Sequence, residues 1–248
     1  MKKYYYDLHI HSCLSPCGDA DMTPGNIAGM ARLAGQDIIA LTDHNSCQNC
    51  PAMAERAKEV GLVFIPGMEM TSAEDAHIIC LFPGLDEAMG FDKLVVSRTP
   101  FIQNDSKKFG EQQICGKDDN IIETLERSLY MASDIGLDEV AALVAGHGGV
   151  AYPAHIDRPY SSVVSALGVF PDWAGFTAAE ISLRGDVAEQ AGLHPAILPL
   201  IKIRSSDSHY LHQMQSRHGF AELEDPSPEA VISAIRSGEK SRFGYIVM

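Results

Sequence analysis

Short runs of apolar residues alternate with longer amphipathic stretches along most of the chain. The short runs are typical of strands buried in a parallel sheet, whereas apolar residues at helical spacing are typical of helices. This alternation predicts an α/β fold whose parallel sheet is closed, or nearly closed, into a barrel. The expected strands are residues 4–11, 37–41, 62–69, 77–82, 149–155, 177–183 and 200–205, and the expected helices are 24–35, 52–59, 121–132, 138–146, 187–191 and 228–237.

The alternation weakens between residues 85 and 120. Residues 93–97 have the composition of a strand, but the stretch that follows is mixed and polar. We interpret residues 1–248 as one barrel domain with an inserted loop or hairpin at about 85–120. Residues 243–247 are expected to form an apolar tail or an edge strand.

The composition narrows the classes of function. Hydrophobic residues make up 46% of the 248 residues, and the net charge of -14 argues against a protein that coats nucleic acid non-specifically. No stretch has the roughly 20 apolar residues of a membrane span, and the N-terminus lacks the apolar core of a signal peptide. We therefore expect a cytoplasmic protein without a membrane partner. Its six cysteines are too few for a disulfide scaffold.

Histidines and carboxylates collect at the ends of the expected strands. His9 and His11 share one face because strand side chains alternate, which sets them ~6–7 Å apart along the strand and allows them to hold one metal ion. In a barrel, the carboxyl ends of the strands carry the active site. The other residues in this position are His44, Glu69, His155, Asp207 and His209.

Imidazole and carboxylate ligands suit zinc, manganese or iron(II) rather than calcium. The set is too large for one ion, so we expect two or three divalent ions bridged by a carboxylate. Sites of this type bind an ester phosphate, generate a metal-bound hydroxide near neutral pH and stabilise the leaving oxygen.

These motifs resemble the PHP family, the polymerase and histidinol phosphatase domain. The resemblance implies a stand-alone metal-dependent phosphoesterase with a distorted (βα)7 TIM-like barrel of parallel strands and a trinuclear site at their C-terminal ends. The motifs follow the family's order and cover nearly the whole chain: His9-x-His11, Thr42-Asp43-His44, Gly67-x-Glu69, His77 opening an apolar strand, Pro153-Ala154-His155 and Ser206-Asp207-Ser208-His209.

The resemblance also implies which residues hold each ion. The loop after His11 is longer than the family pattern and contains both Asp19 and Asp21; Asp19 is preferred because it precedes Pro24 by the usual five positions. The implied ligands are His9, His11, Glu69 and Asp207 for the first ion, bridging Glu69 with His77 and His155 for the second, and Asp19, His44 and His209 for the third.

The remaining polar residues near the expected site leave alternatives open. Asp7 shares the face of His9 and His11, and is either a partner that orients a histidine or a buried hydrogen-bonded carboxylate. Arg158 and Arg184 are candidate catalytic residues that clamp a substrate phosphate, with ordinary exposed loop arginines as the alternative. No role is expected for His147, His194, His212 and His218.

The leading functional hypothesis is hydrolysis of a small phosphomonoester or nucleotide by metal-bound hydroxide. It implies a small phosphorylated substrate as the partner and makes stable nucleic-acid binding an unexpected property. The alternatives are a nuclease acting on nucleic-acid ends, against which the acidic balance weighs, and a non-catalytic metal-binding regulatory domain, against which the complete ligand set weighs.

Four cysteines lie on the loops after the first two expected strands. Neighbouring loops of one barrel face could gather their thiols into a second, structural site for zinc or an iron–sulfur cluster. The alternative is free thiols or one reversible disulfide. The four residues are Cys13, Cys17, Cys47 and Cys50.

Overall fold

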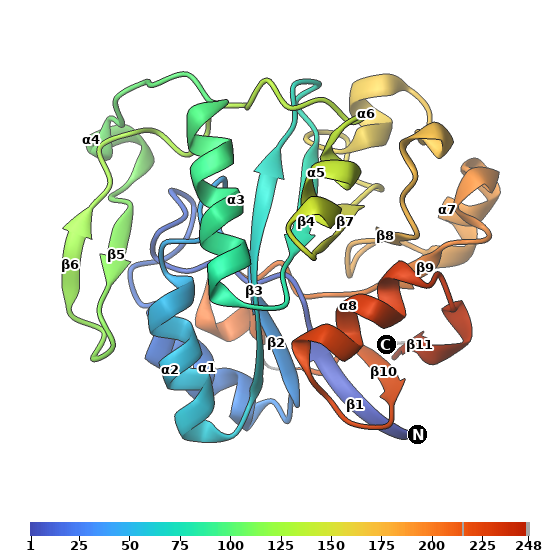
Figure 1. Ribbon diagram of the computed structural model, residues 1–248, viewed down its shortest axis with the longest axis horizontal. Helices are drawn as coiled ribbons and strands as arrows, with labels where there is room; N and C mark the ends of the chain where they lie inside the picture. The colour runs from blue at the N-terminus through green and yellow to red at the C-terminus, as the bar shows by residue number, and fades with distance from the viewer. Residues whose placement is uncertain (215, 247–248) are drawn as a thin grey trace.

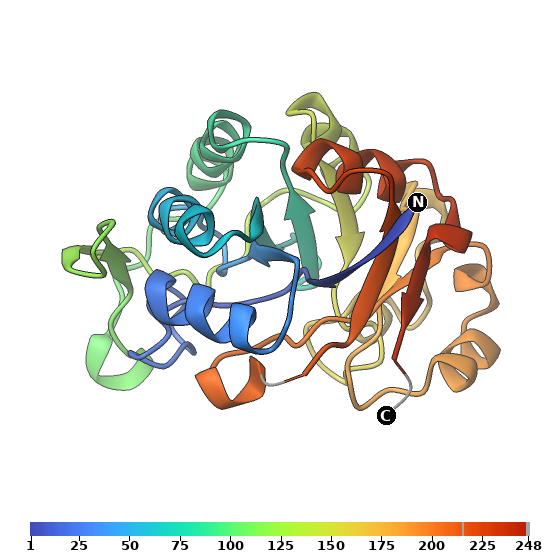
Figure 2. The ribbon, with the colours of Figure 1, turned by 90° about the horizontal axis from the view of Figure 1, so that it is seen from below.

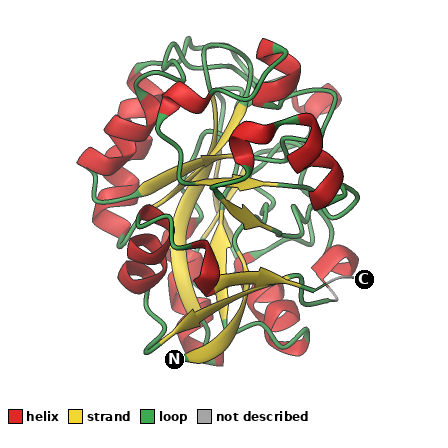
Figure 3. Ribbon diagram, turned by 90° about the vertical axis from the view of Figure 1, so that its right-hand side faces the viewer, coloured by secondary structure: helices red, strands yellow, loops and turns green. Residues whose placement is uncertain are grey.

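A computed structural model describes residues 1–214 and 216–246, which fold around a curled seven-stranded sheet. Figure 3 shows strands at the centre of the molecule and helices on the outside. The strand order is β11-β10-β1-β2-β3-β4-β7. Their bounds are β1 Lys2–Asp7, β2 Ile38–Leu41, β3 Val63–Thr71, β4 His77–Leu81, β7 Val150–Pro153, β10 Gly219–Leu223 and β11 Phe243–Tyr245.

Helices cover the outside of this sheet, and Figures 1 and 2 show α1, α2 and α3 along one side. The first helix begins where the sequence predicts, with the Thr23 side chain accepting a hydrogen bond from the Asn26 N–H and Pro24 in the first turn. The longer helices are α1 Pro24–Leu33, α2 Cys50–Val60, α3 Leu85–Ser97 and α8 Pro228–Arg236, and the shorter ones are α4 Ser106–Phe109, α5 Val140–Gly146, α6 Val163–Leu167 and α7 Val187–Leu193.

Strand directions confirm the α/β class and correct one detail of the prediction. Strands β1, β2 and β3 are parallel, but β4 runs antiparallel to both β3 and β7, and β10 runs antiparallel to β1. The connection between β3 and β4, residues 72–76, is too short for the crossover that a parallel pair needs, so the two strands form a hairpin. A barrel of parallel strands alone is therefore wrong.

A separate parallel pair, β8 (Ala178–Glu180) and β9 (Ile201–Ile203), lies between the two ends of this curl. The backbone N–H of Ile156, which follows β7, donates to the backbone carbonyl oxygen of Glu180 at 2.9 Å. The His11 N–H, after β1, donates to the Ser208 oxygen, also at 2.9 Å. Backbone hydrogen bonds thus bring the carboxyl ends of β1, β7, β8 and β9 together.

Two layers of apolar side chains hold this arrangement. One lies between the sheet and its outer helices and includes Ile27, Leu41 and Met53. The other lies inside the curl, where Tyr6, Tyr152 and neighbouring strand residues meet the buried face of α8. Helix α8 thus fills part of the space enclosed by the strands and packs against their apolar side chains.

The region predicted as an insertion and the stretch directly after it contain the largest departures from the sequence-based elements. Residues 93–97, expected as a strand, belong to helix α3, because Ala88, Phe91 and Val95 supply a buried stripe at helical spacing. Residues 121–132, expected as a helix, instead begin with strand β6 (Ile121–Thr124), which pairs with β5 (Gln113–Cys115) in a hairpin. This hairpin projects from one side of the molecule (Figure 1).

Other predicted elements occur near their expected places, including α5, β7, α7, β9 and α8. The chain end forms the edge strand β11, while Val247 lies outside the described residues. Strand β10, although its burial alternates, was not predicted because it is a short run flanked by polar residues. Among the described residues, no helix combines the length and the apolar character needed to cross a membrane.

Candidate metal centre

Four residues meet at the carboxyl end of β1. The Nε2 atoms of His9 and His11 are 3.1 Å apart, and both lie 3.2 Å from Oδ1 of Asp207. Glu69 approaches the same atoms, with Oε1 at 3.3 Å from His9 Nε2 and Oε2 at 3.2 Å from His11 Nε2. All four side chains are buried. The residues implied for the first ion therefore converge.

Glu69 lies at the centre of a wider cluster. Its Oε1 is 3.0 Å from His77 Nδ1 and 3.0 Å from His155 Nε2, and its Oε2 is 3.0 Å from His44 Nδ1. His77 reaches this edge because β4 is antiparallel: its first residue, His77, pairs with Thr71 at the carboxyl end of β3. The start of one strand and the end of the other thus lie at the same end of the barrel.

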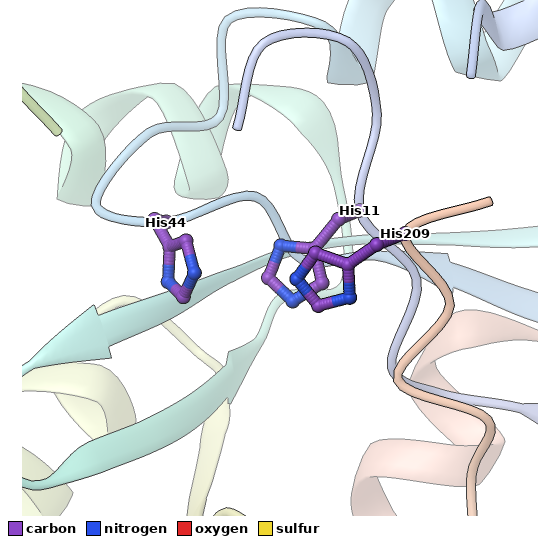
Figure 4. Close-up of side chains that lie close together, drawn as sticks. All are labelled: His11, His44 and His209. Atoms are coloured by element: carbon purple, nitrogen blue, oxygen red, sulfur yellow. The ribbon is translucent and has the colours of Figure 1, made fainter. Parts of the chain in front are cut away.

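His11, His44 and His209 form a third group, in which the His11 ring lies 4.2 Å from His209 and 4.6 Å from His44, centre to centre. Figure 4 shows these rings coming from three separate segments of the chain. In three groups of the described residues, the candidate ligand atoms lie within 4.8 Å of one another: His9–His11–Glu69, His44–Glu69–His77 and His11–His44–His209.

Asp19 lies next to this cluster but is not a member of these three groups. Its backbone N–H donates to the backbone carbonyl oxygen of His209 at 2.9 Å, and its Oδ1 accepts from the backbone N–H of Asp21 at 2.9 Å. The backbone contact places the loop beside the third group. The role of Asp19 as a ligand stays a prediction.

The donor set fits divalent cations. Imidazole nitrogens and carboxylate oxygens that face one another at 3.0–3.3 Å present several lone pairs to the same small volumes. Nitrogen and oxygen donors of this kind suit zinc, manganese and iron(II). The arrangement can therefore hold metal ions.

Electrostatics distinguishes two kinds of histidine in the cluster. Burial disfavours protonation of His9, but Asp207, Glu180 and Glu69 outweigh it and raise the pKa of His9 well above its ordinary value. Burial likewise opposes the charge on His11, yet hydrogen bonds to Asp207 and Glu69 raise the pKa of His11 to about 9. Burial lowers the pKa of His44 to about 4.

The same charges act on the remaining ligands. Burial lowers the pKa of His209 to about 3. Glu69 and Asp207 are buried, which opposes ionisation, but the surrounding histidines hold the pKa of both carboxyls well below the ordinary value. Because a metal ligand must be deprotonated, ion binding would displace protons from His9 and His11.

Three further side chains orient the histidines, and sequence reasoning missed them. Glu180, at the end of β8, lies 3.0 Å from Nδ1 of His9. Ser15 Oγ lies 2.9 Å from Nδ1 of His11 and donates to Asp43 at 2.7 Å. Glu180 had a usable signal, because it is the one charged residue in the predicted strand 177–183. Partners of this kind set the direction of a ligand's free nitrogen.

Asp7 does not contact a histidine ring. Its Oδ1 accepts from the backbone N–H groups of Ser206 at 3.0 Å and His9 at 3.4 Å. Burial raises the pKa of Asp7 to about 6. Of the two roles considered, the structure thus supports a buried hydrogen-bonded carboxylate.

Backbone strain occurs at two of the candidate ligands. His155 has φ 26° and Asp207 has φ 51°, both in the left-handed region that side chains other than glycine seldom adopt. Such conformations persist where surrounding contacts hold them, and they concentrate at functional sites. At these two positions the chain thus adopts an unfavourable backbone conformation that places the ligand side chain in the cluster.

An open cleft of about 1040 Å³ adjoins the cluster, and Asp207 and His209 line it. The guanidinium of Arg158 contacts the Asp207 carboxylate, and Arg184 lines the same cleft. Both arginines therefore lie within reach of a group bound at the cluster. Tyr160 and Tyr210 form other parts of the wall.

The four loop cysteines do not converge. Cys13 Sγ lies 3.4 Å from Cys115 Sγ, Cys17 lines the cleft, and Cys47 and Cys50 both lie against the Gly67 oxygen. None of the three ligand groups among the described residues contains a cysteine. The predicted four-cysteine metal site stays unconfirmed.

Comparison with known proteins gives a family match. Residues 7–167 match the model of the PHP domain. A 5'-3' exoribonuclease of Haemophilus influenzae is 29% identical over 102 residues, and an uncharacterised protein of Methanocaldococcus jannaschii is 33% identical over 92 residues. These matches cover 40% and 34% of this chain, and 33% and 53% of the two relatives, so the chain corresponds to only part of each.

Solved structures share the fold. Endonuclease Q of Pyrococcus furiosus superposes with a TM-score of 0.72 at 20% identity, covering 95% of this chain and 56% of that chain. Endonuclease Q in complex with a 27-mer duplex, with an abasic lesion at its active site, gives 0.71 at 19% identity, covering 95% and 57%.

The duplex complex corrects one prediction. The acidic composition suggested a small phosphorylated substrate and made stable nucleic-acid binding unexpected, but a protein of this fold binds a duplex at its active site. Net charge describes the whole surface, whereas a nucleic acid contacts only one face. An acidic total is therefore a poor guide to the partner.

Proposed function

Since the chain belongs to the PHP domain family, whose fold is that of metal-dependent phosphoesterases and nucleases, we propose that it is a phosphodiesterase acting on nucleic acid. The names of the similar proteins support this proposal, because one is an exoribonuclease and the other an endonuclease. The observation that carries it is the cleft of about 1040 Å³ that leads from open solvent to Asp207 and His209. A closed pocket would suit a small monoester better than a polymer.

Three ions are proposed at the cluster. His9, His11, Glu69 and Asp207 would hold the first, Glu69 with His77 and His155 the second, and His44 and His209 with Asp19 the third. Such ions, when bound, supply an activated water and positive charge that stabilises the phosphoryl oxygens. Zinc, manganese and iron all suit this donor set.

Other side chains of the protein would orient the histidine ligands and neutralise the charge of the substrate phosphates. Glu180 and Ser15 hold the rings of His9 and His11, so that Nε2 of each faces the cluster. Arg158 contacts Asp207 and lines the cleft, so its guanidinium can move to a phosphate oxygen while staying near the carboxylate. Arg184, further along the cleft, would contact the next phosphate.

The test compares three substrates with the manganese-loaded protein: bis(p-nitrophenyl) phosphate, p-nitrophenyl phosphate and a single-stranded oligonucleotide. The proposal expects turnover of the diester and the oligonucleotide, and loss of turnover after chelation or in His11→Ala. His194→Ala, a histidine outside the cluster, is the matched control and should keep its activity. The proposal would be wrong if the protein hydrolysed only the monoester. It would also be wrong if the fully metal-loaded protein hydrolysed none of the three esters.

A further inference from the structure

The aromatic side chain of Tyr130 lies beside the metal cluster, and Phe109, from the region predicted as an insertion, packs against it. Tyr130 and Phe109 are 44% and 46% exposed, and their rings meet edge to face at 5.5 Å between centres. Folding normally buries side chains of this size, and an exposed aromatic pair has faces free to contact a ligand. We call the two residues the aromatic step.

The aromatic step is continuous with the cluster. The Tyr130 ring lies 6.2 Å from the His44 ring, and burial and then the nearby Cys17 thiol raise the pKa of Tyr130. Cys17 in turn lines the same cleft as Asp207 and His209. The aromatic step is therefore linked to the cluster through His44 and to the cleft through Cys17.

Cationic side chains accompany the aromatics on both sides of the cluster. Lys107 and Lys108 directly precede Phe109 and are exposed, although the chain as a whole carries -14. On the other side, the cleft wall combines Arg158 and Arg184 with the exposed rings of Tyr160 and Tyr210. Aromatic rings beside positive charges are the combination that binds single-stranded nucleic acid.

We propose that the aromatic step stacks the bases of a single strand that crosses the metal cluster, while the cleft receives the strand on the other side. The proposal rests on the proposed function and adds its substrate class, a single strand that continues past the scissile phosphate in both directions. A mononucleotide would occupy one side only and would leave the aromatic step unused. A duplex keeps its bases stacked on each other and could not place them on Tyr130.

Binding tests the proposal separately from catalysis. The probe is a fluorescein-labelled, phosphorothioate-linked single strand of roughly ten thymidine nucleotides, and fluorescence anisotropy reports its Kd for the metal-loaded protein. Tyr130→Ala and Phe109→Ala should each weaken binding roughly 10-fold, because stacking one base on an aromatic ring contributes this much. Tyr130→Phe keeps the ring and should restore affinity. Phe101→Ala, an exposed aromatic of the same region, is the matched control and should bind like the wild type.

Strand length gives a second readout. With the wild type, KM should fall as the oligonucleotide becomes long enough to reach the aromatic step, and Tyr130→Ala should lose this dependence. Equal affinity of Tyr130→Ala and the wild type for the single strand would overturn the proposal, and so would an equal effect of Tyr130→Ala on a duplex of the same length. If the protein does not hydrolyse bis(p-nitrophenyl) phosphate but its binding of the single strand still depends on Tyr130, the proposed function is wrong and the stacking site is supported.

Discussion

The carboxylate of Glu180 binds the ring of His9 and the backbone of His155 at the same time. Its Oε1 lies 3.0 Å from His9 Nδ1 and accepts the His155 N–H at 3.2 Å. One residue of β8 therefore positions two candidate ligands that follow different strands, His9 after β1 and His155 after β7. In Glu180→Gln the shape is kept but the charge is lost, so we expect metal affinity to fall roughly 10- to 100-fold.

Competition with a chromophoric chelator measures this affinity, and far-UV circular dichroism reports whether the fold is kept. Glu189→Gln, a change of the same type in helix α7, is the control. Unchanged affinity in Glu180→Gln would show that the contact with His9 has no role in metal binding.

His11 is a proposed ligand of the first ion and also lies close to His44 and His209, so its loss should remove that ion and disturb the neighbouring third group. We expect His11→Ala to lower the metal content of the purified protein and to abolish phosphodiester turnover while the barrel stays folded. Elemental analysis by mass spectrometry gives the ion count. Full metal content with retained turnover would contradict the assignment of His11.

Arg158 is expected to hold a substrate phosphate, and charge-assisted hydrogen bonds contribute strongly to binding. Arg158→Ala should raise KM for an oligonucleotide roughly 10- to 100-fold. Arg158→Lys should rescue only part of this loss, since an ammonium cannot form the two parallel hydrogen bonds of a guanidinium.

Arg158 also contacts Asp207, so metal content must be measured on the same variants. A normal KM together with a reduced ion count would assign Arg158 to the metal site alone. Arg184→Ala, exposed in the same cleft, is expected to change KM and leave the ion count unaltered.

Cys47 and Cys50 are buried in the layer between the sheet and its helices. The double variant Cys47→Ser, Cys50→Ser should keep the ion count of the wild type, because these thiols lie with the Gly67 oxygen and away from the three ligand groups. Its Tm should fall, since a hydroxyl is less favourable than a thiol in an apolar layer. A reduced ion count would revive the four-cysteine metal site.

His218 is outside the three ligand groups, and its titration is expected to make the stability of the folded protein depend on pH. Burial, and then the nearby Arg204 guanidinium, lowers the pKa of His218. The folded state therefore resists protonation, so stability is present above the unfolded-state pKa of about 6.5 and is lost as pH falls below it.

His218→Leu should accordingly flatten the decline of Tm between about pH 6.5 and pH 5. Differential scanning fluorimetry across this range checks the slope, and His212→Leu, an exposed histidine, serves as the control. An unchanged slope in His218→Leu would exclude this residue as a source of the acid sensitivity.

The sequence by itself determined the α/β class and most of the residues that meet at the cluster. It could do so because both signals are local: the alternation of apolar runs marks strands, and His9, His44, Glu69 and Asp207 stand at their ends. Once these strands lie side by side, their carboxyl ends meet at one edge, so adjacency in space follows from position along each strand.

Only the tertiary structure decided the direction of β4, the hairpin of β5 and β6 and the partners that orient the ligands. Strand direction depends on which strands pair, and the contact of Glu180 with His9 joins residues 171 positions apart. In the tertiary structure, moreover, the four loop cysteines do not converge, and Tyr130 lies beside His44. Periodicity describes one element at a time, whereas these contacts depend on the packing of several elements at once, and that packing has no local pattern in the sequence.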